Sequence, residues 1–259
     1  MQLQLFQVDA FSATTLSGNP AAVCPLAEWL PDEKLQAIAA ENNVAETAYF
    51  VRTGETYQLR WFTPQVEVDL CGHATLAASW VLFHELSATD ETLRFDTRSG
   101  ELRVCRDGDR LAMDFPGTMP QPCTPPAGLL PALGISSATV LEARDYVVVV
   151  DSPAEVAALT PDFTALKAVT KFGVSVTARG EQFDFVSRWF GPRIGVDEDI
   201  TTGAAHAWLA PYWATQLGKQ LLTAEQGGRR KGQVTCEVKG DRVILSGHAA
   251  TYLKGVVTV

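Results

Sequence analysis

A pentapeptide occurs twice in this chain, and this repeat constrains the fold more than any other feature of the sequence. Arg60-Trp61-Phe62-Thr63-Pro64 recurs as Arg188-Trp189-Phe190-Gly191-Pro192. Because tryptophan is scarce, with 6 in 259 residues, chance is a poor explanation for the match. The repeat predicts a structural duplication. Two copies are too few for a solenoid, so we expect two similar halves with a cleft between them.

Each copy of the repeat leads into the same kind of segment. An acidic stretch follows, 67–69 or 196–199, and a glycine then opens an apolar segment that is predicted to be helical, Gly72 or Gly203. The start of a helix carries unpaired N–H groups and the positive end of the dipole, which together suit a carboxylate ligand. Glycine there lets a ligand approach the backbone closely. A purely architectural role for the repeat is the alternative.

The predicted order of elements is mixed α+β. Helices are predicted at 31–43, 72–86, 153–159 and 203–216. Strands are predicted at 2–9, 20–24, 47–52, 57–63, 92–97, 101–106, 110–115, 145–151, 172–178, 183–189, 233–239, 242–248 and 252–259. Helices and strands do not alternate regularly, which argues against a doubly wound sheet. Six prolines in 116–133 favour a linker. We therefore expect halves at 1–117 and 118–259, with the last strand able to pack with the first half.

Composition limits the classes of partner and compartment. The formal net charge of -9 and a pI of about 4.9 disfavour nucleic acid and anionic membranes. No stretch approaches the ~20 apolar residues of a membrane span, and the first residues alternate like a strand, unlike a signal peptide. The five cysteines are widely spread, so neither a disulfide framework nor a zinc site is expected. These features favour a soluble cytoplasmic protein.

Five segments, taken together and in this order, resemble the signatures of the PhzF-like family of phenazine-biosynthesis proteins. They are 18–23 (GNPAAV), 43–50 (NVAETAYF), 60–64 (RWFTP), 70–77 (LCGHATLA) and 198–206 (EDITTGAAH). The resemblance implies a diaminopimelate-epimerase-type fold, in which each of two α+β halves wraps a mixed sheet around a central helix. It also implies an isomerase that transfers a proton without metal or organic cofactor, on a dihydro-hydroxyanthranilate in the best-known member. Family members usually form homodimers.

Glu46, His73 and Asp199 are the candidate catalytic residues. From the residues alone, Glu46 is either an exposed strand-edge carboxylate or a desolvated one with a raised pKa. His73 follows the helix-opening glycine, where the dipole favours the neutral imidazole; a buried structural histidine is the alternative. Asp199 belongs to an acidic run that is usually solvated. The resemblance implies that Glu46 is the catalytic acid/base and that the other two hold a carboxylate-bearing substrate.

The resemblance also implies a set of substrate-binding residues at the two helix starts: Gly72, Ala74, Gly203 and Ala204. Family members often have serine at the position of Ala204, and alanine removes a hydroxyl that could touch the substrate. This departure favours a divergent member with a different substrate, or a non-catalytic binding protein of the same fold.

Related epimerases and racemases use one cysteine from each half, so Cys71 raises an amino-acid epimerase as a further alternative. Matching the two glycines places Thr202 opposite Cys71, and a hydroxyl is too weak an acid to replace a thiol. We therefore expect Cys71 to be a small buried residue. His84, His206 and His248 lack metal-ligand spacing. The basic loop 227–232 matches no phosphate-binding motif and is expected to be solvated.

Overall fold

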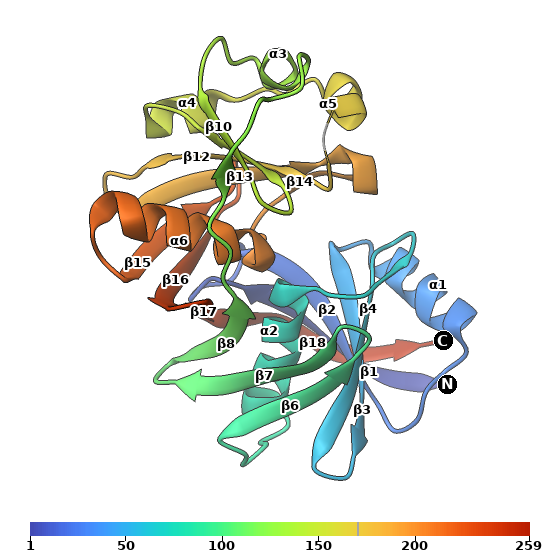
Figure 1. Ribbon diagram of the computed structural model, residues 1–259. Helices are drawn as coiled ribbons and strands as arrows, with labels where there is room; N and C mark the ends of the chain where they lie inside the picture. Colours follow the sequence, from blue (N-terminus) through green and yellow to red (C-terminus); the bar gives the residue numbers. More distant parts are fainter. Residues whose placement is uncertain (170) are drawn as a thin grey trace. The chain divides into compact units, whose positions relative to one another are not determined.

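The computed structural model describes residues 1–169 and 171–259 of the chain (Figure 1). Backbone contacts group these residues into two compact units. One unit comprises Met1–Asp114 together with Ser246–Val259, and the other comprises Phe115–Leu245. Strands β8 (Arg110–Pro116) and β17 (Arg242–Gly247) run through the two boundaries. Within the described residues, no helix is both long and apolar enough to cross a membrane.

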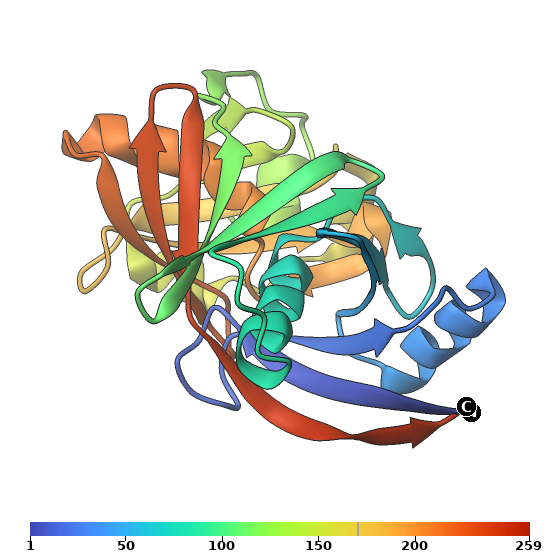
Figure 2. The ribbon, with the colours of Figure 1, turned by 90° about the horizontal axis from the view of Figure 1, so that it is seen from below.

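The first unit is built on a mixed sheet. Its other strands are β1 (Gln2–Ala10), β2 (Asn19–Leu26), β3 (Glu46–Thr53), β4 (Thr56–Phe62), β5 (Glu67–Val68), β6 (Thr92–Thr97), β7 (Gly100–Asp107) and β18 (Ala249–Thr258). β18 lies antiparallel to β1 along its length, which brings the chain termini together (Figures 1 and 2). The Met1 ammonium donates to the Val259 carbonyl at 2.6 Å, so the pairing extends to the last residue.

Two helices cover this sheet. Helix α1 (Asp32–Asn42) packs Leu35, Ile38 and Ala39 into a buried cluster on one face, and it ends where Asn43 adopts left-handed backbone. Helix α2 (Gly72–Trp80) contacts β1, β2, β3 and β18, and Figure 2 shows it in the curve of these strands. Its first seven residues after Gly72 are buried, as its apolar sequence predicts, and it continues into a π-helical turn at Val81–Glu85.

The second unit has the same kind of architecture. Its other strands are β9 (Gln121–Pro122), β10 (Thr139–Glu142), β11 (Tyr146–Val149), β12 (Val174–Arg179), β13 (Phe185–Gly191), β14 (Val196–Asp199), β15 (Leu221–Gln226) and β16 (Gly232–Lys239). Helix α6 (His206–Leu217) packs against β15 and β16. A separate core joins strands β10 to β13 to three short helices: α3 (Leu129–Leu133), α4 (Pro153–Ala158) and α5 (Phe163–Val169).

The strand pairings of the first unit recur one for one in the second. β1–β2 is antiparallel, β2–β3 parallel, β3–β4 antiparallel, β4–β5 antiparallel, β4–β6 parallel and β6–β7 antiparallel. β10–β11, β11–β12, β12–β13, β13–β14, β13–β15 and β15–β16 repeat these senses in the same order. The predicted duplication and the α+β class are therefore confirmed.

The proline-rich stretch 116–133 contains a helix, which corrects the prediction of a structureless linker. Leu129 and Leu133 of α3 are buried in the core of the second unit. Pro131 lies in the first turn of α3, where its missing N–H costs no intrahelical hydrogen bond. The short elements α5, β10, β14 and β15 were also not predicted, because each presents too few residues for a periodic pattern.

Candidate active site

Each arginine of the repeat binds a glutamate of the strand that follows it. Arg60 donates from Nε and Nη2 to the two carboxylate oxygens of Glu67, at 2.7 and 2.8 Å. Arg188 makes the same two-pronged contact with Glu198, at 2.7 and 2.7 Å. Such bidentate pairs fix orientation as well as distance. The repeat therefore anchors β5 and β14 and determines where the chain turns toward each helix.

The residue that precedes each helix lies four residues after the corresponding glutamate. It is Cys71 in one unit and Thr202 in the other. Both carbonyl groups are bonded by a side chain four residues further along. Thr75 Oγ1 donates to the Cys71 carbonyl at 2.6 Å, and His206 Nδ1 donates to the Thr202 carbonyl at 3.0 Å. The two helix starts are thus equivalent in construction, although α6 is preceded by a single 3-10 turn at Gly203–Ala205.

Glu46 and His73 meet inside the first unit. Glu46 begins β3 and His73 is the second residue of α2. His73 Nε2 lies 3.0 Å from Glu46 Oε2, and the side chains are 4% and 15% exposed. The contact is ionic without hydrogen-bond alignment, and among the described residues neither atom has a hydrogen-bond partner. The pair therefore places a potential base beside a potential acid where both are largely shielded from water.

The charge of His73 differs from the sequence prediction. Burial alone lowers the pKa of the imidazole, but contacts with Cys71 and Glu46 outweigh burial and raise it well above 6.5. The helix dipole was expected to favour neutral imidazole. That expectation is wrong, since a carboxylate at 3.0 Å acts more strongly than partial charges of a helix end.

Cys71 is buried and contacts the second ring nitrogen of His73. Its Sγ is 3.5 Å from His73 Nδ1, which donates to the sulfur when the ring is protonated. Burial, and then the charge of Glu46, raise the pKa of the thiol to about 11. The group therefore stays a thiol at neutral pH. The expectation that Cys71 is buried is confirmed, and its contact with His73 was not predicted.

Glu46, Cys71 and His73 each offer a metal-ligand atom, all within 4.8 Å of one another. However, the sulfur faces Nδ1 and the carboxylate faces Nε2. The arrangement fits a chain of proton donors and acceptors better than it fits a metal centre.

In the second unit, Asp199 closes β14 and is bonded to the residue before the helix. Thr202 Oγ1 donates to Asp199 Oδ2 at 2.6 Å, and the side chain of the buried Gln226 bonds to both residues. His206 is fully buried, and burial lowers its pKa to about 4 despite the opposing effect of its bond to Thr202. His206 is therefore a neutral, structural histidine across the physiological range.

The predicted site residues thus fall into two groups. The first unit holds Glu46, Gly72, His73 and Ala74, and it brings Glu46 and His73 into contact. The second unit holds Asp199, Gly203 and Ala204. Gly203 is buried and opens the 3-10 turn before α6, with Ala204 beside it and half-buried.

Sequence reasoning missed Gln226. The only available signal was its place in β15, where alternate residues Leu222, Ala224 and Gln226 are all buried. A glutamine on the apolar face of a strand must find hydrogen-bond partners inside the protein, so the alternation marks it as a candidate once the strand is known. No strand was predicted at 221–226, so this alternation of buried residues could not be recognised from the sequence.

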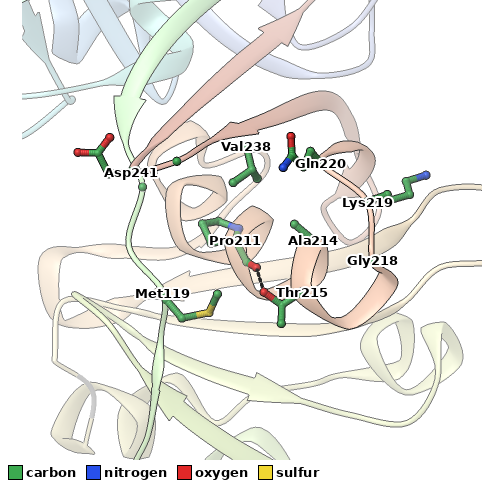
Figure 3. Close-up of a pocket in the computed structure, with 11 residues that line it drawn as sticks. Met119, Pro211, Ala214, Thr215, Gly218, Lys219, Gln220, Val238 and Asp241 are labelled. Atoms are coloured by element: carbon green, nitrogen blue, oxygen red, sulfur yellow. Dashed lines mark hydrogen bonds between the residues drawn. The ribbon is translucent and has the colours of Figure 1, made fainter.

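A surface groove of about 670 Å³ lies elsewhere in the second unit (Figure 3). It is bordered by Pro211, Ala214 and Thr215 of α6, by Met119 and by Val238 of β16. None of the residues that line it is a predicted site residue. Its walls hold one lysine and one aspartate, Lys219 and Asp241. The groove therefore carries no chemistry comparable to the Glu46–His73 pair.

Comparisons with known proteins agree on one family. The model of the family described as phenazine biosynthesis-like protein matches residues 8–255. An isomerase of uncharacterized role from Pseudomonas aeruginosa is 62% identical over 99% of both chains, and a second from the same organism is 50% identical over 98% of both. The crystal structure of a phenazine biosynthesis PhzF-family protein from Enterococcus faecalis is 45% identical over 100% of both chains, with a TM-score of 0.97.

A more distant structural likeness concerns the fold alone. A hydroxyproline epimerase from Agrobacterium vitis, solved with trans-4-hydroxy-L-proline, superposes with a TM-score of 0.58 at 12% identity, over 99% of this chain and 92% of that one. The duplicated architecture is therefore shared with epimerases.

Proposed function

This chain belongs to the phenazine biosynthesis-like protein family and is an isomerase, and we propose that it moves a proton between two positions of a small carboxylate-bearing substrate without a cofactor. The observation that carries the proposal is the buried contact between Glu46 and His73, whose facing atoms have no hydrogen-bond partner among the described residues. A proton shift changes no oxidation state, so positioned acids and bases are sufficient for it.

In the proposed mechanism Glu46 acts first as base and then as acid. Its carboxylate removes a proton from a substrate carbon, and the electron pair of the broken C–H bond moves into the conjugated system of the substrate. The carboxyl proton of Glu46 exchanges with solvent, and Glu46 then delivers a proton to a second atom, which restores the carboxylate. His73 is a cation 3.0 Å from this carboxylate and stabilises the negative charge that develops on the substrate. A positioned acid/base of this kind typically contributes ~10²–10⁴ in rate.

The substrate carboxylate is proposed to bind at the helix starts. Gly72 and Gly203 each begin a helical segment whose first N–H groups have no partner within the helix. Asp199 would accept a hydrogen bond from an amine or hydroxyl of the substrate. Ala204 cannot donate one, which supports a substrate with fewer polar groups at that position than in family members with serine.

Proton transfer by one residue is favoured over an epimerase mechanism that uses two thiols. Cys71 is a thiol with a pKa of about 11, and its counterpart in the other unit is Thr202. Neither group can take a proton from carbon at neutral pH without a stronger base. The carboxylate of Glu46 can, and its counterpart in the second unit is Gly173, the residue before Val174 just as Glu46 precedes Thr47. The proposal therefore requires one residue to deliver and collect the proton.

The reaction class can be tested in deuterium oxide with three probes: dihydro-hydroxyanthranilate, trans-4-hydroxy-L-proline and L-proline. Proton NMR of the wild-type reaction should show a shifted double bond in dihydro-hydroxyanthranilate, with deuterium at the carbon that receives the proton, and no change in the two amino acids. Inversion and deuteration at the α-carbon of either amino acid, with dihydro-hydroxyanthranilate unchanged, would contradict the proposal in favour of an epimerase.

A further inference from the structure

We propose that Gln226 is a positioning residue, which holds the carboxylate of Asp199 in place through the hydroxyl of Thr202; the inference rests on the proposed function, in which Asp199 binds the substrate. Gln226 ends β15 and is 0% exposed. It lies outside every sequence motif that singled out the site.

The hydrogen bonds of the Gln226 amide allow one orientation only. Its Oε1 accepts from the Thr202 backbone N–H at 3.1 Å. Its Nε2 donates to the Asp199 carbonyl at 3.1 Å and to Thr202 Oγ1 at 3.0 Å. A flipped amide would place oxygen against a carbonyl and NH₂ against an N–H, so the assignment follows from the partners. Both amide hydrogens and the oxygen are used.

The orientation of the Gln226 amide determines how the Thr202 hydroxyl bonds to Asp199. Because Thr202 Oγ1 accepts from Gln226, its own hydrogen points away and is donated to Asp199 Oδ2 at 2.6 Å. The backbone of Thr202 is held on both sides, its N–H by Gln226 and its carbonyl by His206. His206 remains neutral and keeps its hydrogen on Nδ1, because a carbonyl oxygen only accepts. Every polar group of Thr202 is thus fixed by a buried side chain.

The first unit shows that the fold does not require this glutamine. In the pairing of β13 with β15, Phe185 lies opposite Ala224 and Val186 opposite Glu225. The next pair is Ser187 with Gln226. The matching pairs are Tyr57 with Phe95 and Gln58 with Asp96, so the counterpart of Gln226 is Thr97. Thr97 instead bonds the carbonyl of Gly100 in its own hairpin. The same architecture forms without the amide, which places the role of Gln226 at the site and not in the fold.

A crystal structure of Gln226→Met tests the positioning directly and needs no substrate. Methionine keeps the length and volume but offers no hydrogen bond. We expect the contact between Thr202 Oγ1 and Asp199 Oδ2 to be lost and the Asp199 carboxylate to occupy more than one rotamer, while the helix and strands stay in place. Thr202→Val should release Asp199 in the same way, and Thr202→Ser should keep it. An Asp199 carboxylate that is unmoved in Gln226→Met would overturn the inference.

The kinetic constants KM and kcat distinguish a positioning role of Gln226 from a merely structural one. For dihydro-hydroxyanthranilate, Gln226→Met should raise KM about tenfold with kcat changed less than about twofold, because binding is lost and the proton-transferring group is untouched. The double variant with Thr202→Val should match the single variants, since all break one chain of contacts. Gln233→Met, an exposed glutamine on the adjacent strand β16, is the control and should match the wild type.

These outcomes separate the inference from the proposed function. A wild-type protein that is inactive on dihydro-hydroxyanthranilate excludes that compound as the substrate, and the crystal structure of Gln226→Met then decides the inference alone. If the wild type is active and Gln226→Met keeps both kinetic constants, the positioning role is wrong although the isomerase activity stands.

Discussion

Glu46 and His73 lie 3.0 Å apart in the first unit, and the contacts of His73 with Cys71 and with Glu46 raise its pKa. The imidazole has a pKa well above 6.5 in the folded protein, against its ordinary value in the unfolded chain. The folded state therefore holds a proton that the unfolded chain releases at neutral pH. This stabilisation is fully present below about pH 6.5 and is lost as pH rises through the folded pKa.

Replacing His73 with asparagine should remove that pH dependence. Between pH 6 and 10 the free energy of unfolding of the wild type should fall, and the fall should be markedly smaller in His73→Asn, because asparagine binds no proton. Urea unfolding at several pH values, followed by circular dichroism, measures both slopes. His84→Asn is the matched control and should keep the wild-type slope, since burial lowers the pKa of the partly exposed His84. Equal slopes for wild type and His73→Asn would show that His73 is neutral.

Cys71 should matter little for catalysis. Serine keeps its size and can still accept the hydrogen of His73 Nδ1, so turnover in Cys71→Ser should fall less than about threefold, because the native group is already a protonated thiol at neutral pH. Turnover rates of the two proteins on dihydro-hydroxyanthranilate provide the measurement. A loss of a hundredfold or more would mean that the thiolate transfers the proton.

At the scale of elements, the two arginine–glutamate pairs of the repeat carry the same geometry with different burial. The side chain of Arg188 is 9% exposed and that of Arg60 is 19% exposed. Arg188 also donates to the Leu159 carbonyl at the end of α4, at 2.8 Å. Loss of Arg188 therefore leaves both a partly exposed carboxylate and a helix-end carbonyl without their partner.

We expect Arg188→Met to destabilise the protein by about 3 kcal/mol, the usual cost of breaking a buried ion pair by removing one partner. Arg60→Met should cost less, since the side chain of Arg60 is more exposed than that of Arg188. Arg103→Met is the control, because its contact with Glu101 is 64% and 36% exposed and should be worth less than about 1 kcal/mol. Urea unfolding measures all three. A ranking with Arg188→Met equal to the control would contradict the role assigned to the repeat.

In the second unit, the position that corresponds to the proposed acid/base Glu46 carries no side chain. Gly173 occupies the place in the second unit that Glu46 holds in the first. A Cβ at Gly173 would lie 2.3 Å from the indole ring of Trp189, so no side chain fits there. Trp189 is itself held by a hydrogen bond from Nε1 to Asp145 at 2.8 Å. The tryptophan of the repeat thus fills the second position.

At the scale of the whole molecule, the architecture could be predicted from the sequence more completely than the site could. The repeated Arg-Trp-Phe-x-Pro predicted the duplication, because tertiary contacts of an arginine and a tryptophan preserve those residues in both copies. Helix α1 and the strands around it followed from capping and alternation. Helix α3 was not predicted, since its proline and the five that precede it resemble those of a linker.

The site was only partly readable, because its properties come from contacts between distant segments. Glu46 and His73 were predicted as separate candidates, and their 3.0 Å contact and the raised pKa of His73 needed the packing of α2 on β3. Gln226 acts through β15, a strand that pairs with β13 across about forty residues of sequence. No local pattern encodes such pairings.

The central claim is that one carboxylate transfers the proton, and the turnover of Glu46→Gln tests it most directly. Glutamine is isosteric and cannot exchange a proton at neutral pH. With dihydro-hydroxyanthranilate in deuterium oxide, we expect deuterium incorporation by Glu46→Gln to fall ~10²–10⁴-fold below the wild type. Binding measured by calorimetry and the circular dichroism spectrum should stay close to those of the wild type. Incorporation at a rate near that of the wild type would contradict the account and assign the proton to another group.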